Sequence, residues 1–322
     1  MLSPKISIII PMYNVEKYIK RCLLSVFHNS IINDCEVILI DDCSTDNTIQ
    51  VAEDLVAQHR FIQVKLICNS FNKGSAESRN IGLQNSIGKY IICVDSDDWV
   101  ESNYLELLYN EAEATNADVT CCDFFRECKA GNFVVRANPG STARDVVSNI
   151  ANNKYFGYLW IKLLKRSFIE KNHLFFIEKI DLWEDVLFSL KIFSEDPIFS
   201  YINVPLYHYF DNPLSIVHGL TSEKCLNLRL AVEEIERFWK KTGLFNEYLK
   251  DLITLIIRID ILIVLKSNID SYKNLKKLTK EQYWFSKISL SKKILYFVLI
   301  KMYNPVGRFV SFGFKKIKKI KD

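Results

Sequence analysis

Short apolar runs alternate with helical repeats along the first third of the chain. Runs rich in β-branched residues predict four strands, at Ile6–Pro11, Glu36–Asp41, Val64–Asn69 and Lys89–Asp95. Apolar residues at helical spacing predict helices over Val15–Asn29, Ser44–His59, the segment after Phe71–Asn80, and Asn103–Thr115. In the second helix we expect Ser44 at the N-cap and Asp46 in the first turn. Strands that are apolar on both faces and separated by helices predict an α/β fold, with a sheet covered on both sides.

The alternation of apolar runs and helical repeats becomes less regular in the middle of the chain. Asp118–Cys128 predicts one more strand, and a polar loop is expected from there to Asn153. A mixed aromatic region follows, in which Leu182–Phe193 has helical periodicity. Beyond it the sequence is nearly all helical.

This change of pattern predicts two domains, residues 1–220 and a helical region, residues 221–322. The most apolar stretch of the second domain is Leu252–Leu265, which Arg258 and Asp260 interrupt. No window reaches the length of a membrane span, so a buried helix is expected there.

Composition and charge narrow the class of protein. The 322 residues carry a net charge of +4, which is too small to indicate nucleic-acid binding. The nine cysteines are odd in number and contain no C-x-x-C pair, and no secretion signal begins the chain. We therefore expect a reduced, cytoplasmic protein.

Polar residues follow three of the four predicted strands, at Pro11–Asn14, Asp41–Asp42 and Asp95–Asp98. Because a parallel sheet binds its ligand at the carboxyl ends of its strands, we expect these residues to line one site. The turn after the first strand has neither G-x-G-x-x-G nor G-x-x-x-x-G-K-S/T. A dinucleotide oxidoreductase or a P-loop enzyme is therefore not expected.

The acidic strand ends have two interpretations each. Asp41 and Asp42 either form an ordinary turn before a helix or accept a hydrogen bond from a nucleotide. Asp95, Asp97 and Asp98 either form a solvated turn or bind Mg²⁺ or Mn²⁺, because several neighbouring carboxylates repel without a cation. An aspartate phosphatase would need an Asp on the first strand, which has none, and a phospho-receiver module is much shorter than this chain.

Four segments together resemble the family 2 glycosyltransferases of GT-A fold. They are SIIIPMYNVEKYIKRCLLSV, EVILIDDCSTDNT, NKGSAESRNIGL and GKYIICVDSDDWV, in the family's order within residues 5–115. The resemblance implies a Rossmann-like nucleotide-binding sheet within a mixed sheet, with helices on both faces and here a helical C-terminal extension. Residues 1–115 would then bind the nucleotide-sugar, and residues 116–220 the acceptor.

The resemblance also implies donor-binding residues. Those expected around the nucleotide base and the nucleotide sugar are Pro11, Tyr13, Asn14, Asp42, Gly74, Arg79, Asp95 and Ser96. Asp97 would bind the metal, and Asp95 would face the ribose or sugar or share the metal. Asp98 would contact the donor sugar or cap the next helix.

The second half resembles the family at three further places. Asp185 in LWEDVLFSLKIF would be the general base, with Glu184 either orienting the acceptor or taking that role; alternatively both only favour a helix start. In YLWIKLLKRSFI, Trp160 would face a sugar ring and Lys162 a phosphate, or the segment is a core strand. His218 would complete the metal site or be an ordinary surface histidine.

The activity implied is an inverting, Mn²⁺- or Mg²⁺-dependent transfer of a sugar from a nucleotide-diphospho-sugar, expected to be UDP-linked. The acceptor would be a hydroxyl of a growing glycan or a lipid-linked acceptor, in capsule, lipopolysaccharide or exopolysaccharide synthesis. The alternative is a non-catalytic nucleotide-sugar-binding or regulatory module. The last nine residues, FKKIKKIKD, hold five lysines, which favours peripheral contact with an anionic membrane at its inner face over a solvated tail.

Overall fold

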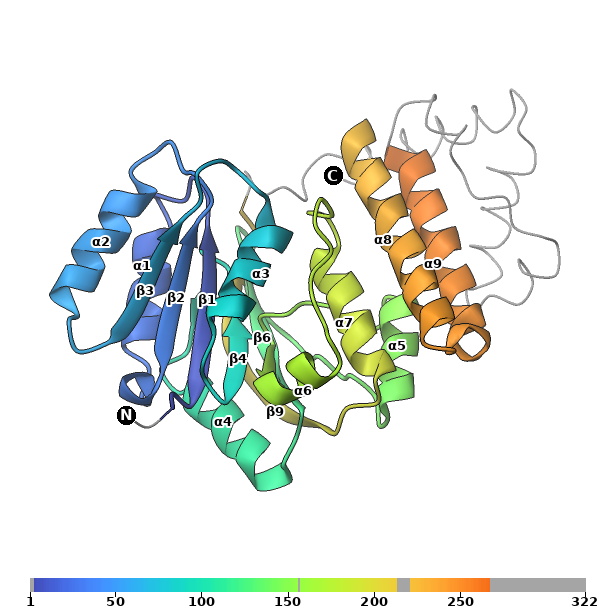
Figure 1. Ribbon diagram of the computed structural model, residues 1–322, viewed down its shortest axis with the longest axis horizontal. Helices are drawn as coiled ribbons and strands as arrows, with labels where there is room; N and C mark the ends of the chain where they lie inside the picture. The colour runs from blue at the N-terminus through green and yellow to red at the C-terminus, as the bar shows by residue number, and fades with distance from the viewer. Residues whose placement is uncertain (1–2, 156, 213–220, 267–322) are drawn as a thin grey trace. The chain divides into compact units, whose positions relative to one another are not determined.

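The computed structural model describes residues 3–155, 157–212 and 221–266. The chain forms two compact units, residues 1–146 with 155–215 and residues 147–154 with 216–322. The first unit contains a sheet, and the second contains a pair of long helices (Figure 1).

The described strands form one nine-stranded sheet in the order β3-β2-β1-β4-β8-β6-β9-β5, with β7 paired to β6. Its first four strands are parallel, and they are β1 (Ile6–Met12), β2 (Glu36–Asp41), β3 (Gln63–Cys68) and β4 (Tyr90–Cys93). The helices between them are α1 (Ile19–Phe27), α2 (Thr48–Gln58) and α3 (Ser75–Asn85). Every side chain of β2 and β4 is buried, as the apolar runs predict. The carboxyl ends of these strands therefore meet at one edge, as Figure 1 shows.

The rest of the sheet mixes strand directions. β8 (Lys162–Lys165) pairs antiparallel with both β4 and β6 (Val119–Cys128), and β9 (Phe199–Phe210) runs parallel to β6. The short β5 (Trp99–Val100) pairs antiparallel with β9. The remaining elements of this half are η1 (Ile32–Asp34), α4 (Tyr104–Thr115), α6 (Arg166–Lys171) and α7 (Glu184–Ser194). Because β9 reaches back to β5, it lies beside the acidic turn that follows β4.

Two predictions about local structure are wrong. The expected polar loop contains β7 (Gly131–Val135), which pairs with β6, and α5 (Ala143–Ala151). The second helix begins at Thr48 rather than at Ser44. Ser44 does not cap it, because its Oγ accepts a hydrogen bond from the backbone N–H of Asn14, at 3.0 Å.

The second unit contains α8 (Ser222–Lys241) and α9 (Phe245–Lys266), joined by a short turn. A buried ion pair links them, with Arg229 Nη2 2.7 Å from Asp260 Oδ1. The apolar segment predicted as a buried helix lies in α9, and that prediction is confirmed. Among the described residues, no helix combines the length and the apolar character needed to cross a membrane. The basic C-terminal segment, with its predicted membrane contact, lies outside the described residues.

Candidate active site

The turn after β4 is anchored to β9 through Asp98. Its Oδ2 accepts a hydrogen bond from the Tyr207 hydroxyl, and its Oδ1 accepts one from the Phe210 backbone N–H, both at 2.7 Å. Asp98 is only 1% exposed, and burial, with the charges of Asp97 and Asp95, raises the pKa of its carboxyl well above the ordinary value. Both of its oxygens therefore serve the fold. The alternative role, a cap of the next helix, is not seen, because Asn103 precedes α4; the donor contact predicted for Asp98 stays a prediction.

Asp97 and Asp95 are half-buried at the same turn. Asp97 Oδ2 accepts a hydrogen bond from Asn212 Nδ2 at 2.9 Å, and burial followed by the charge of Asp95 raises the pKa of its carboxyl. The Asp97 carbonyl also accepts a hydrogen bond from Arg21, at 2.7 Å, which fixes the backbone here. Ser96, between the two acids, is buried.

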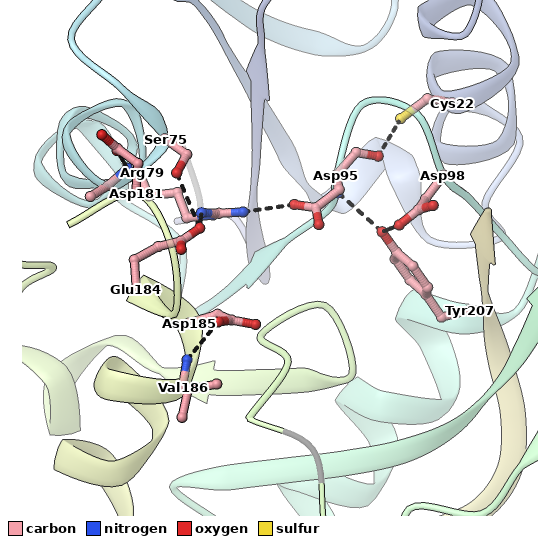
Figure 2. Close-up of polar contacts among 11 residues, drawn as sticks. Cys22, Ser75, Arg79, Asp95, Asp98, Asp181, Glu184, Asp185, Val186 and Tyr207 are labelled. Atoms are coloured by element: carbon pink, nitrogen blue, oxygen red, sulfur yellow. Dashed lines mark hydrogen bonds and ion pairs between the residues drawn. The ribbon is translucent and has the colours of Figure 1, made fainter. Parts of the chain in front are cut away.

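Arg79 of α3 joins this turn to the start of α7, as Figure 2 shows. Its Nη2 lies 2.8 Å from Asp95 Oδ1, and its Nη1 lies 2.6 Å from Glu184 Oε1. Ser75 Oγ donates a second hydrogen bond to Glu184 Oε1, at 3.1 Å. Burial alone lowers the pKa of Arg79, but the charges of Asp95 and Glu184 outweigh it and the net shift is upward. The guanidinium is therefore a permanent cation between two carboxylates.

The first turn of α7 carries the two acids predicted for catalysis. Trp183, which precedes them, has left-handed backbone angles (φ 70°), a conformation that costs a bulky residue about 1–2 kcal/mol. Burial raises the pKa of Glu184 to about 7; Arg79 opposes the shift and Asp185 adds to it. Burial also raises the pKa of Asp185, whose Oδ1 accepts a hydrogen bond from the Val186 N–H. Asp185 thus has a local backbone contact, while Glu184 is held by the arginine.

Asp181, which sequence reasoning did not identify, holds the start of α3. Gly74 precedes that helix with φ +90°, and a Cβ on it would lie 2.3 Å from Asp181 Oδ1. The Ala76 backbone N–H donates to the same oxygen, at 3.3 Å. A glycine immediately before a helix is the only signal in the sequence for this close approach. Gly74 is therefore needed for the packing of the site, and its predicted role beside the nucleotide sugar stays a prediction.

Asp42 organises the loop between β3 and α3. Its Oδ1 accepts hydrogen bonds from Asn69 Nδ2 and the Lys73 N–H, and its Oδ2 accepts one from the Gly74 N–H, each at 2.8 Å. It is 4% exposed, and its predicted contact with the base stays a prediction. Its neighbour Asp41 has a buried Oδ1 without a hydrogen-bond partner, although its Oδ2 accepts from the backbone.

The other residues predicted around the base lie at the end of β1. Tyr13 is 47% exposed there, and Pro11 is half-buried. Asn14 has left-handed backbone angles (φ 52°), and its Oδ1 accepts a hydrogen bond from the Thr45 N–H at 2.8 Å. This bond joins the turns after β1 and β2, and the roles of all three residues toward a base stay predictions.

Trp160 and Lys162 are buried, which agrees with the interpretation of their segment as core. Trp160 is 4% exposed, and its ring stacks on that of Tyr207 with 4.3 Å between centroids. Lys162 is fully buried, and its Nζ donates to the Tyr158 carbonyl. Burial lowers the pKa of Lys162 to about 8. Both side chains lie in the core of this structure, and the donor contacts predicted for them stay predictions.

The metal prediction can be tested only in part. His218 lies outside the described residues, and the described part of the chain contains no group of three His, Cys, Asp or Glu side chains suited to a metal. Mg²⁺ and Mn²⁺ commonly take one or two carboxylates together with substrate phosphates. Asp97, with Asp95 through the oxygen that Arg79 does not bind, supplies that kind of donor set. These residues therefore fit the ion.

A family model described as glycosyl transferase family 2 matches residues 7–178. The uncharacterised glycosyltransferase EpsJ of Bacillus subtilis (strain 168) is 32% identical over 222 residues, which cover 67% of this chain and 63% of EpsJ. The poly(ribitol-phosphate) β-N-acetylglucosaminyltransferase TarS of Staphylococcus aureus is 28% identical over 207 residues, covering 64% of this chain and 35% of TarS. The chain thus spans less than two thirds of the length of either relative.

Solved structures agree with the sequence comparisons on the fold. Residues 1–349 of S. aureus TarS in complex with UDP-GlcNAc superpose with a TM-score of 0.70 at 19% identity, covering 97% of this chain and 92% of that one. The mannosyltransferase PcManGT of Pyrobaculum calidifontis, in complex with GDP-Man and Mn²⁺, gives a TM-score of 0.54 at 16% identity, with 93% and 88% covered. The predicted GT-A fold is confirmed. Together with the family match over more than half of its residues, this shows that the chain belongs to glycosyl transferase family 2.

Proposed function

We propose that this glycosyltransferase moves a sugar from a UDP-linked donor to a hydroxyl of a surface glycan, with inversion at the anomeric carbon. The observation that carries the proposal is the Arg79 bridge. One guanidinium holds a carboxylate of the acidic turn after β4 and a carboxylate of the first turn of α7 (Figure 2). Two residues predicted for donor binding, Arg79 and Asp95, are therefore linked to Glu184, one of the two acids predicted for catalysis.

The donor side of the proposal rests on Asp97 and Asp95. A divalent ion held there would neutralise the charge that develops on the departing diphosphate. The complexes of TarS with UDP-GlcNAc and of PcManGT with GDP-Man and Mn²⁺ support a nucleotide-sugar and a metal in this fold. Tyr13, exposed at the end of β1, offers a ring on which a base can stack.

Asp185 is our proposed general base. An alcohol gives up its proton only in the transition state, and a carboxylate whose pKa burial has raised is a better acceptor for that proton. The acceptor oxygen would form a bond to the anomeric carbon while the bond from that carbon to the donor phosphate oxygen breaks. The proton would pass to Asp185, and attack from the side opposite the leaving group would invert the centre. Glu184, fixed by Arg79 and Ser75, would orient the acceptor.

The acceptor belongs to a bacterial surface polymer in this proposal. Support comes from the likeness to TarS, whose name describes transfer to poly(ribitol-phosphate). A lipid-linked acceptor and contact with the inner face of an anionic membrane are proposed from the basic residues 314–322 alone. A cytoplasmic location is proposed from the cysteine pattern.

Calorimetric titration of the purified protein with UDP-sugars, with and without Mn²⁺, tests the proposal. We expect binding of UDP and of at least one UDP-sugar that weakens when EDTA removes the metal, and slow metal-dependent hydrolysis of that donor. NAD and ATP are the matched ligands that should not bind. Absence of UDP binding would refute the donor class, and binding without hydrolysis or transfer would favour a non-catalytic module.

A further inference from the structure

Four aromatic rings form a stacked ladder. Two of them, Tyr158 and Trp160, come from the segment before β8, and two, Tyr207 and Tyr209, come from β9. Trp160 lies in its middle, with Tyr207 at 4.3 Å, Tyr158 at 4.7 Å and Tyr209 at 5.6 Å between ring centroids. All of these pairs are stacked within 16° of parallel. Trp160 and Tyr207 are buried, whereas Tyr158 and Tyr209 are only half-buried. The ladder thus runs from the core to a pair of partly exposed tyrosines, whose rings lie 6.2 Å apart.

The residue before one member of this pair lies against the first turn of α7. Gly157, the residue before Tyr158, is so close to Val186 that a Cβ on it would lie 2.6 Å from the Val186 Cα. Ser189 Oγ also donates a hydrogen bond to the Gly157 carbonyl. Val186 follows Asp185 directly, so the backbone of Tyr158 is held beside the proposed base. Consistent with this, the charge of Asp185 adds to burial in raising the pKa of Tyr158 to about 12.

The other member lies beside the acidic turn. Phe210, the residue after Tyr209, donates its backbone N–H to Asp98 Oδ1 at 2.7 Å. Asn212, further along the same segment, donates to Asp97 Oδ2 at 2.9 Å. Tyr209 is therefore held next to the carboxylates proposed for the metal. The two tyrosines together connect the base side of the site to the donor side.

We infer that Tyr158 and Tyr209 form the platform on which a sugar ring of the acceptor stacks during transfer. A pyranose has an apolar face of C–H groups and a polar edge, and a tyrosine ring offers a large apolar face with a hydroxyl at its end. The acceptor is the partner that fits, because its hydroxyl must reach Asp185, and Gly157, the residue before Tyr158, is packed against the turn that carries Asp185. This inference rests on the proposed function, since it assumes that Asp185 receives the acceptor proton.

The role predicted for Trp160 thereby passes to its neighbours. Trp160 is 4% exposed and cannot present a face to a sugar, but it supports both tyrosine rings by stacking on them. A rigid ring behind a binding ring lowers the entropy lost when a ligand binds. Trp160 is therefore a positioning residue.

Saturation-transfer NMR with methyl β-glycosides of glucose, galactose and N-acetylglucosamine, in the presence of UDP and Mn²⁺, tests the inference. Saturation of the tyrosine ring protons should reach the C–H protons of at least one glycoside. Tyr158→Ala and Tyr209→Ala should each weaken its binding roughly tenfold, because each removes an aromatic contact. Tyr158→Phe and Tyr209→Phe keep the ring and should retain binding.

Phe133→Ala is the matched control, because Phe133 is an aromatic residue on β7 that is 51% exposed and outside the ladder. The platform is refuted if no glycoside receives saturation from aromatic protons, or if both alanine variants bind as the wild type does. UDP affinity is measured on every variant and reports whether it is folded. It also separates the two proposals, because a wild-type protein that does not bind UDP refutes the proposed donor class and not the platform. Should Tyr158→Ala fail to fold, Tyr209→Ala decides.

Discussion

The acidic turn after β4 and the segment from Asp181 to Asp185, where α7 begins, are built alike. Each has three acids, Asp95, Asp97 and Asp98 in the first and Asp181, Glu184 and Asp185 in the second. In each, one acid serves the fold: Asp98 bonds to β9, and Asp181 bonds to the start of α3. In each, a second acid pairs with the same arginine, namely Asp95 or Glu184 with Arg79.

The third acid of each group has the simplest surroundings. Asp97 accepts from the amide of Asn212, and Asp185 accepts from the N–H of the residue that follows it. Neither forms an ion pair with Arg79. The carboxylate of each is therefore the one in its group whose charge a substrate or metal can bind. The comparison teaches that the acids of a motif are not equivalent. Under the proposed function, Asp97 and Asp185 would carry the reaction chemistry, Asp95 would share the metal, and the other three acids would align the site.

Removing the carboxylate of Asp185 should have the largest effect. We expect Asp185→Asn to lower the rate of transfer by about 10²–10⁴-fold, the usual contribution of a general base. UDP affinity in the presence of Mn²⁺ should not change, because Asp185 does not belong to the donor side. The rate is measured as UDP released with a saturating acceptor, and retained transfer would remove Asp185 from the role of base.

Breaking the Arg79 bridge should have the next largest effect, on the free energy of unfolding. Arg79→Met leaves Asp95 and Glu184 without their cation, and an uncompensated buried charge of this kind costs about 3–5 kcal/mol. The free energy of unfolding, from denaturant titration, measures the loss. Arg126→Met is the matched control: Arg126 pairs with Asp211 and is 54% exposed, so the loss should be below about 1 kcal/mol. Equal losses in the two variants would contradict a bridge of special importance.

The raised pKa of Glu184 predicts a pH dependence of stability. The unfolded chain releases this proton near the ordinary pKa of 4.5, whereas the folded chain keeps it until about pH 7. Between these values the unfolded state binds fewer protons, so this group makes the protein less stable as pH rises. The shift corresponds to roughly 3 kcal/mol across that interval.

The measurement compares the wild type with Glu184→Gln, which cannot titrate, by denaturant unfolding at about pH 4 and about pH 8. The stability of the wild type relative to the variant should fall by roughly 3 kcal/mol between the two. A difference that is the same at both pH values would show that Arg79 keeps Glu184 ionised throughout.

Much of the fold could be predicted because the parallel strands are apolar on both faces. Such runs have one stable environment, the centre of a covered sheet, and β1, β2 and β4 lie there, whereas β3 is an edge strand with half-buried and exposed side chains. The elements missed include β7 and α5, short segments within a polar region. β7 pairs only with β6 among the described strands, and most of its side chains are exposed. Its sequence therefore has no periodic apolar face from which a strand could be predicted.

Only those parts of the site that lie within a single sequence motif could be predicted. The acids were found because they follow strands or begin a helix, but Arg79 and Glu184 are 105 positions apart, and no local pattern shows that they touch. The choice between the two interpretations of Trp160 was left open for a related reason. β8 begins only at Lys162, so Trp160 does not belong to a strand. The alternation of inward and outward side chains along a strand therefore could not predict which way its ring faces.

The smallest predicted effect concerns Asp97, and it tests the donor side of the comparison. Asp97→Ala should weaken UDP binding in the presence of Mn²⁺ by about 10–100-fold, the range seen when support of a metal site is lost. Without metal, the variant and the wild type should bind UDP equally, since the carboxylate acts through the ion. Asp34→Ala is the matched control, because Asp34 is an exposed acid that pairs with Lys5. If calorimetry gives the same metal-dependent affinity for Asp97→Ala as for the wild type, Asp97 is not the ligand. The metal would then have to bind through Asp95, whose pairing with Arg79 would have to break, and the parallel between the two acidic groups would fail.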